Sequence, residues 1–168
     1  KRCAVVRAGG ARDGSASNNA IWVVDTGIAY GHPALNVDQS RAVNFTVSPT
    51  GSRADDDNGH GTMIAGIAAA KKMDWDLDHK ICIGVSVGAR VVPIKVLDSD
   101  GIGAWSSVVA ALDTIAWMSA PGDVINLSIG DYPAPGCNTT NIDGLKLALT
   151  NAAIKNFIII AAGNNGGH

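Results

Sequence analysis

The chain alternates between short apolar runs and longer segments with helical spacing of apolar residues. Four runs have the length of a strand: residues 21–24, 91–96, 124–127 and 157–161. Most of them lack alternation of apolar and polar side chains, which is typical of parallel strands covered on both faces. Pro93 interrupts the second run and cannot donate to a ladder, so we expect that strand where this donor is not needed.

The segments between these runs predict helices. Apolar residues recur at positions i, i+3, i+4 and i+7 in two of them: Val108, Ala111, Leu112 and Ile115, and then Leu145, Ala148, Leu149 and Ala152. Ser106 or Ser107 is a plausible cap for the first helix. Residues 61–70 are apolar on every side, which predicts a helix buried all round. Strands that alternate with helices predict an α/β fold, a parallel sheet with helices on both faces.

The length of 168 residues fits one domain, and 46% hydrophobic residues fit a large buried core. Residues 1–19 carry arginines and a stretch rich in Gly, Ser and Asn. We interpret this segment as a surface arm that leads into a domain formed by residues 20–168.

Charge excludes some classes of partner. Lysines and arginines number 13 against 15 acidic residues, a formal net charge of -2, so there is no basic excess of the kind that binds nucleic acid. No apolar run approaches the roughly 20 residues that a membrane helix needs. We therefore expect neither nucleic acid nor a membrane as a partner.

The cysteines and two glycosylation triplets favour an extracellular protein. Cys3, Cys82 and Cys137 lack C-x-x-C spacing, so a zinc site is not expected, and at most one internal disulfide can form. Residues 44–46 and 138–140 match the N-glycosylation sequon, a triplet that also arises by chance.

His60 is the strongest candidate for chemistry. It stands between two glycines, directly before the apolar segment 61–70. Histidine titrates near neutral pH and can therefore shuttle a proton during catalysis. The flanking glycines let backbone and substrate come close, and a helix start would hold the ring rigidly. We therefore interpret His60 as a general base.

Polar residues follow several of the apolar runs, at the strand ends where α/β sheets gather functional groups. Asp25 could accept the Nδ1 proton of His60 and stabilise the imidazolium. Asn164 could donate to a developing oxyanion, which is worth roughly 3–4 kcal/mol in known cases. Taken alone, each position also fits a structural role, as a turn cap for Asp25 and as an Asn-Gly turn for Asn164.

Three motifs together resemble the subtilisin-like serine proteases. Residues 24–27 (VDTG), 58–62 (NGHGT) and 162–164 (AGN) occur in the order and rough spacing of that family. The resemblance covers roughly residues 20–168 and implies the N-terminal portion of a three-layer catalytic domain, incomplete at the C-terminus.

The resemblance also implies roles for residues. Asp25 would orient His60, His60 would act as general base, and Asn164 would help to form the oxyanion hole. Two segments would sandwich an extended polypeptide substrate or peptide inhibitor as an added strand: Gly101, Ile102 and Gly103, and Ser128, Ile129 and Gly130. Ala161, Ala162 and Gly163 would line the first specificity pocket.

One departure concerns the nucleophile. The family carries it in a Gly-Thr-Ser-Met-Ala segment after the oxyanion asparagine, whereas the single Gly-Thr of this sequence, residues 61–62, precedes Met63. Met63 also replaces a second family histidine. Without the missing part, the sheet would expose an apolar face and an unpaired edge. We therefore predict that a second polypeptide from the same precursor carries the serine.

A calcium site is a further expectation. Asp74, Asp76 and Asp78 alternate, so their carboxylates can converge on calcium when the loop curls around it. Members of the family bind calcium near this region, although their ligands do not match these positions one by one. A solvated acidic loop is the other interpretation of this segment.

Two other functions start from the same residues. Residues 23–27 match the hydrophobic-Asp-Thr-Gly motif of aspartic proteases, but that family is almost wholly β and needs two such motifs. A non-catalytic binding module would explain the missing serine. It would not explain why Asp25, His60 and Asn164 are all present.

Overall fold

The computed structural model describes residues 3–46, 53–75, 80–130 and 143–164, the side chains of residues 3–4, 74–75 and 80–82 excepted. Its helices are α1 (Cys3–Arg7), α2 (His60–Ala69), α3 (Trp105–Met118) and α4 (Asp143–Ala153), with a 3₁₀ turn η1 (Gln39–Arg41). Its strands are β1 (Arg12–Asp13), β2 (Ala20–Asp25), β3 (Asn36–Val37), β4 (Val43–Asn44), β5 (Met73–Trp75), β6 (Lys80–Cys82), β7 (Ser86–Val87), β8 (Arg90–Lys95), β9 (Val124–Leu127) and β10 (Phe157–Ile160).

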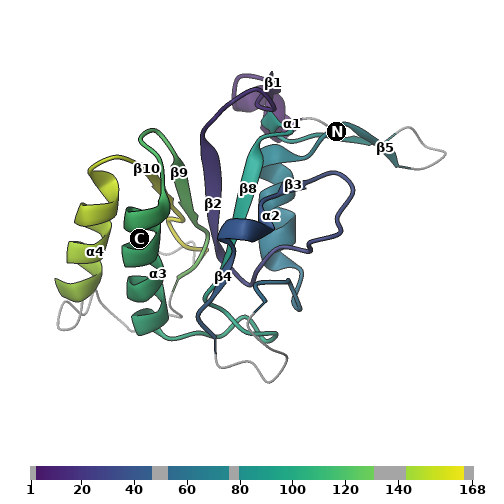
Figure 1. Ribbon diagram of the computed structural model, residues 1–168. Coiled ribbons are helices and arrows are strands. Elements are labelled where there is room, and N and C mark those ends of the chain that lie inside the picture. Colours follow the sequence, from purple (N-terminus) through teal and green to yellow (C-terminus); the bar gives the residue numbers. More distant parts are fainter. Residues whose placement is uncertain (1–2, 47–52, 76–79, 131–142, 165–168) are drawn as a thin grey trace.

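A parallel sheet forms the centre of the domain. Its strand order in the described residues is β10-β9-β2-β8-β3, and β4 pairs with β8 as well. Helix α2 covers one face of this sheet, whereas α3 and α4 cover the other (Figure 1). The predicted α/β fold is confirmed, and the four predicted strands correspond to β2, β8, β9 and β10.

The core has one layer on each side of the sheet. Trp22 and Val24 of β2 pack toward α3 and α4, whereas Val23 between them packs toward α2. This alternation follows from the strand geometry, in which successive side chains point to opposite faces. Because both faces are covered, an uninterrupted apolar run was the correct signal for this strand.

Pro93 lies inside β8, in register with Val23 of β2. On its other edge, β8 pairs with β3 at Arg90 and Val91 and with β4 at Ile94 and Lys95. The proline therefore falls in the gap between these two short pairings. Among the described residues, no strand pairs with β8 at residue 93 on this edge, so no backbone N–H is needed there, as the sequence led us to expect.

The two amphipathic helices are confirmed, but the predicted cap is wrong. All four predicted core positions of α3 are buried, as are Ala148 and Ala152 of α4. Helix α3 starts at Trp105, and its N-cap is Ala104, which makes no side-chain cap. Ser107 lies within the first turn, where its hydroxyl donates to the Phe45 carbonyl oxygen instead (3.2 Å).

Helix α2 is not buried all round. Gly61, Ala65 and Ala69 face the sheet, whereas Met63 and Ile67 are 55% and 56% exposed. Edge strand β10 is exposed too, with Phe157, Ile159 and Ile160 between 55% and 66% accessible. The described residues thus present apolar surface on α2 and on the edge strand β10.

Part of the predicted arm pairs with the domain. Strand β1 pairs with β7 in parallel, and Gly14 donates its N–H to the Val87 carbonyl oxygen (2.9 Å). A side chain at position 14 would overlap Ser86, so this backbone is packed closely onto the domain. None of the helices in the described ranges is long and apolar enough to cross a membrane.

Candidate active site

Asp25 and His60 are brought into direct contact. Asp25 is the last residue of β2 and is fully buried, whereas His60 is the first residue of α2 with a side chain 40% exposed. The His60 Nδ1 and the Asp25 Oδ1 are 2.8 Å apart. A proton on Nδ1 would therefore be held by the carboxylate, which leaves Nε2 free to accept a proton.

The glycines on either side of His60 make this contact possible. Gly59 caps α2 with φ of 104°, a conformation that residues with a side chain rarely adopt. Gly61 lies against the end of β2, where a Cβ would overlap the carbonyl oxygen of Gly27. The two glycines therefore allow the start of α2 to approach Asp25.

Thr26 and Asp56 connect the two elements. The Thr26 hydroxyl accepts from the N–H of Gly61 (3.0 Å) and donates to Asp56 Oδ1 (2.8 Å). Asp56 also accepts from the N–H groups of Gly59 and Thr62, each at 2.9 Å, and from the Thr62 hydroxyl. One carboxylate thus satisfies several donors of the first turn of α2, in place of an ordinary N-cap.

These bonds keep Asp56 ionised. Burial opposes the charge, but hydrogen bonds from the Thr62 hydroxyl and from the N–H groups of Gly59, Thr62 and Asn58 outweigh it, so the pKa of Asp56 is lowered from its ordinary value. The positive end of the α2 dipole also favours an anion at this place.

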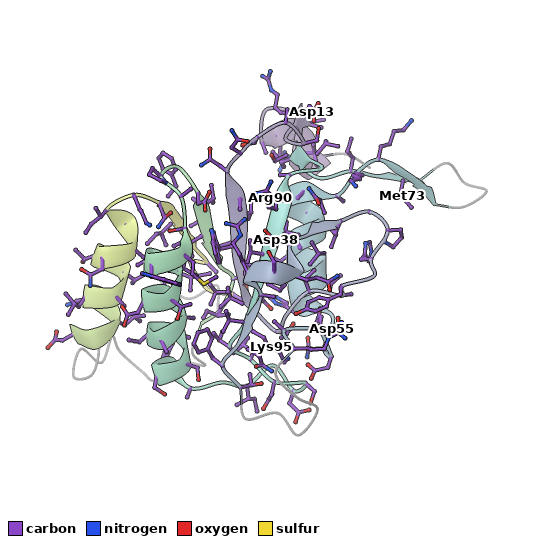
Figure 2. All side chains as sticks on the ribbon, viewed as in Figure 1. Asp13, Asp38, Asp55, Met73, Arg90 and Lys95 are labelled. Atoms are coloured by element: carbon purple, nitrogen blue, oxygen red, sulfur yellow. The ribbon has the colours of Figure 1, made fainter. Side chains whose placement is uncertain are left out.

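Lys95 adds a buried cation at the same end of the sheet. It ends β8, in register with Asp25, and only 1% of the residue is exposed. Its ammonium group donates to Asp57 Oδ1 (2.6 Å) and to the carbonyl oxygens of Thr26 (2.7 Å) and Leu97 (2.8 Å). Figure 2 shows Lys95 near one end of the sheet and Asp13 beyond the other.

A pocket of about 280 Å³ joins the two predicted substrate segments. Its lining includes Gly101, Ile102 and Gly103 of the first segment and Ile129 and Gly130 of the second. Leu97, Ala104, Trp105 and Val108 complete the lining. The side chains in this lining are aliphatic or aromatic, so the pocket suits an apolar side chain.

Other predicted site residues lie at the same edge of the sheet. Ser128 follows β9, does not line the pocket, and accepts a hydrogen bond from the Asn126 amide (2.8 Å). Asn164 is exposed after β10, beyond the exposed residues Ala161, Ala162 and Gly163. Within the described ranges, no hydrogen bond joins its amide to His60 or Asp25.

The metal and disulfide predictions cannot be placed. Asp76, Asp78 and the side chain of Asp74 lie outside the described residues, as do Cys137 and the side chains of Cys3 and Cys82. Among the residues that are described, no group of three His, Cys, Asp or Glu side chains could hold a metal ion.

Sequence reasoning missed Thr26, Asp56 and Lys95 as parts of the site. A signal existed for Lys95, because a lysine at the end of a buried strand must find acceptors. For Asp56 the signal was weaker, since three consecutive aspartates (residues 55–57) also fit a solvated loop.

A buried aspartate bonded to a half-exposed histidine at the carboxyl edge of a parallel sheet is an arrangement in which the carboxylate can orient the ring as a proton acceptor. The chain belongs to the subtilase family, whose model matches residues 16–168. This assignment to the subtilisin-like serine proteases also excludes the almost wholly β fold of an aspartic protease.

Relatives and solved structures agree with this assignment. Subtilisin DY of Bacillus licheniformis is 34% identical over 153 residues, 90% of this chain and 48% of its own. An extracellular serine proteinase of Thermus sp. (strain Rt41A) is 33% identical over 144 residues, 86% of this chain and 30% of its own. The chain thus spans about half the length of these relatives or less.

Among solved structures, Sphericase has a TM-score of 0.71 and 30% identity over 94% of this chain and 49% of its own. A cold-adapted subtilisin-like serine proteinase has a TM-score of 0.66 and covers 92% of this chain and 49% of its own. Its 24% identity supports the fold alone.

Proposed function

We propose that this chain supplies the orienting carboxylate and the general base of a serine endopeptidase that hydrolyses peptide bonds. The observation that carries the proposal is the 2.8 Å contact between His60 Nδ1 and the buried carboxylate of Asp25. The exposed side of the His60 ring is then available to a serine hydroxyl outside residues 1–168.

The mechanism follows from the chemistry of these groups. The serine oxygen attacks the scissile carbonyl carbon while His60 Nε2 takes its proton, and Asp25 stabilises the resulting imidazolium. The amide of Asn164 donates to the oxyanion that forms on the carbonyl oxygen. His60 then gives the proton to the departing amine, and a water molecule, activated in the same way, hydrolyses the acyl-enzyme.

The substrate is proposed to lie as an extended strand between the segments 101–103 and 128–130. Their glycines leave backbone groups accessible for such a strand. The apolar pocket that both segments line would take a side chain of the substrate, and residues 161–163 would contact the residue at the cleaved bond.

We further propose that the serine is carried by a second polypeptide from the same precursor. The exposed apolar residues of β10 and the exposed Met63 and Ile67 of α2 support this, because such surfaces are usually covered. Intact-mass analysis and gel filtration of the purified protein test the idea. A single monodisperse 17.2 kDa species would refute it.

A binding module without activity is the alternative function. Labelling with a fluorophosphonate probe separates the two functions. The protease predicts a label on the serine-bearing polypeptide, and the label must disappear in the His60→Ala variant. A binding module predicts no label on any polypeptide of the purified protein.

Secretion, a disulfide and calcium binding stay predictions. The name of the Thermus relative supports an extracellular site of action.

For calcium, we expect a chelator to lower the melting temperature of the parent protein. The same chelator should have a smaller effect on Asp76→Asn, and equal effects on both proteins would remove this segment as the ligand.

A further inference from the structure

The ammonium group of Lys95 is buried with a full set of partners. It has three N–H donors and no acceptor, and the structure gives it three acceptors within 2.8 Å. Only one of these, Asp57, carries a charge, and its side chain is 39% exposed. The cation is therefore satisfied, with one face of the ion pair close to solvent.

The three acceptors belong to three different parts of the site. Thr26 directly follows the orienting carboxylate Asp25 in the chain, and Asp57 precedes the general base His60 by three residues. Leu97 lines the pocket and leads into the segment 101–103. The Lys95 side chain thus connects the end of β2, the loop before His60 and the segment that leads into residues 101–103.

Stability alone is a poor explanation for this arrangement. Burying an ammonium group costs several kcal/mol before any partner is gained, and apolar residues often replace buried ion pairs without loss of stability. A leucine or methionine at position 95 would match the apolar interior of β8. An apolar residue could supply neither the charge nor the hydrogen bonds that join two carbonyl oxygens and one carboxylate oxygen.

We propose that Lys95 and Asp57 form a positioning pair for the site, which holds the Thr26 and Leu97 carbonyls and balances the charge near His60. The charged groups of β2, of the segment before α2, of β8 and of the loop beyond it are Asp25, Arg53, Asp55, Asp56, Asp57, Arg90, Lys95, Asp98 and Asp100. Arg90 starts β8, at the end away from Asp25, and Arg53 stacks on the Tyr30 ring. Among these described residues, Lys95 is the cation in register with Asp25. The proposal rests on the proposed function for its kinetic consequence, but not for its effect on His60.

The first test follows the His60 ring by NMR in the complete purified protein as the pH is varied. Lys95→Met leaves Asp57 unpaired, which favours the protonated ring, so we expect the titration midpoint to rise by about half a pH unit. Asp57→Asn leaves the cation uncompensated, and the midpoint should fall by a similar amount. The double variant should return toward the parent protein.

Asp113→Asn is the matched control, because it removes the same charge from an exposed position on α3. It should not shift the midpoint. If Lys95→Met does not fold, the exposed partner variant Asp57→Asn still decides the matter. A midpoint that is unchanged in Asp57→Asn and in every folded Lys95 variant would overturn the proposal.

The second test separates positioning from charge through peptide hydrolysis. Lys95→Arg keeps the charge and should retain most activity, whereas Lys95→Met should lower kcat about tenfold and raise KM for substrates that reach the pocket. A midpoint shift without any hydrolysis by the parent would support the pair and reject the proposed function. If Lys95→Met hydrolyses peptides as fast as the parent protein and the His60 midpoint is unshifted, the positioning pair is rejected and the proposed function is supported.

Discussion

The backbone of Gly61 lies against the carbonyl oxygen of Gly27 so closely that a side chain at position 61 would overlap this oxygen. Gly61 belongs to the first turn of α2, and Gly27 lies two residues beyond Asp25. This approach sets the position of His60 relative to its carboxylate. The glycine after the histidine is therefore a requirement of packing.

Gly61→Ala should misplace the base. The methyl group must push the start of α2 away from β2, which lengthens the contact between His60 and Asp25. We expect kcat of the complete enzyme to fall by about a hundredfold, since a shift of about 1 Å can have that effect. Peptide hydrolysis measures it.

Gly66→Ala is the matched control within the same helix. A Cβ at position 66 meets nothing within 4 Å outside the backbone of its own helix. It should stabilise the protein by about 0.5–1 kcal/mol, because alanine favours helix more than glycine does. An equal loss of activity in both variants would mean that the close approach of Gly61 is unimportant.

Asp25→Asn tests the role of the buried carboxylate. The neutral asparagine no longer fixes the tautomer of His60 by accepting a charged hydrogen bond from Nδ1–H. It also no longer stabilises the imidazolium. We expect kcat to fall by about 10⁴ with little change in KM. A rate close to that of the parent would remove Asp25 from the mechanism.

Thr26 tests the link between Asp56 and α2. Thr26→Val removes the hydroxyl that accepts from Gly61 and donates to Asp56, at nearly constant volume. The free energy of unfolding should fall by about 1–3 kcal/mol, because a buried N–H loses its partner. Thr26→Ser keeps the hydroxyl and should stay closer to the parent in urea unfolding. A serine variant as unstable as the valine variant would contradict this account.

How much the sequence could predict depended on whether a feature is local. The strands and the contact between Asp25 and His60 followed from apolar runs and from motifs at strand ends. The network of Thr26, Asp56 and Lys95 did not, since its partners come together only when β2, β8 and α2 are packed. The exposed face of α2 was mispredicted for a similar reason, because an apolar sequence does not say which neighbours are present.

The pocket gives a prediction about substrate choice. Val108 is 3% exposed and lines the pocket together with Trp105 and Ile129. Val108→Ala should enlarge the space and shift preference toward bulkier apolar side chains by about 10-fold in kcat/KM, the worth of one or two methylene groups. A panel of peptides that differ at one position measures this. An unchanged ranking at every position would exclude the pocket as a contact of the substrate.

Asp123 lies at the opposite end of the sheet and is fully buried. Burial opposes its charge, but hydrogen bonds outweigh it and lower the pKa of Asp123 from its ordinary value. The donors are the Trp22 indole N–H, the backbone N–H groups of Ala20 and Ala120, and the Asn19 amide. These bonds fix the start of β2 against the turn before β9.

A lowered pKa in the folded state makes this carboxylate a source of acid sensitivity. Its stabilisation is complete above the unfolded-state value of about 4 and is lost as the pH falls below that value toward the folded-state pKa. Asp123→Asn should lower the free energy of unfolding by about 2–3 kcal/mol at pH 7, because the amide cannot accept from all of these donors. The difference from the parent should stay constant above about pH 5 and shrink as the pH falls below about 4, in urea unfolding followed by tryptophan fluorescence over the range from pH 7 to pH 3. A difference that stays constant over this range would show that the charge of Asp123 is not what the fold uses.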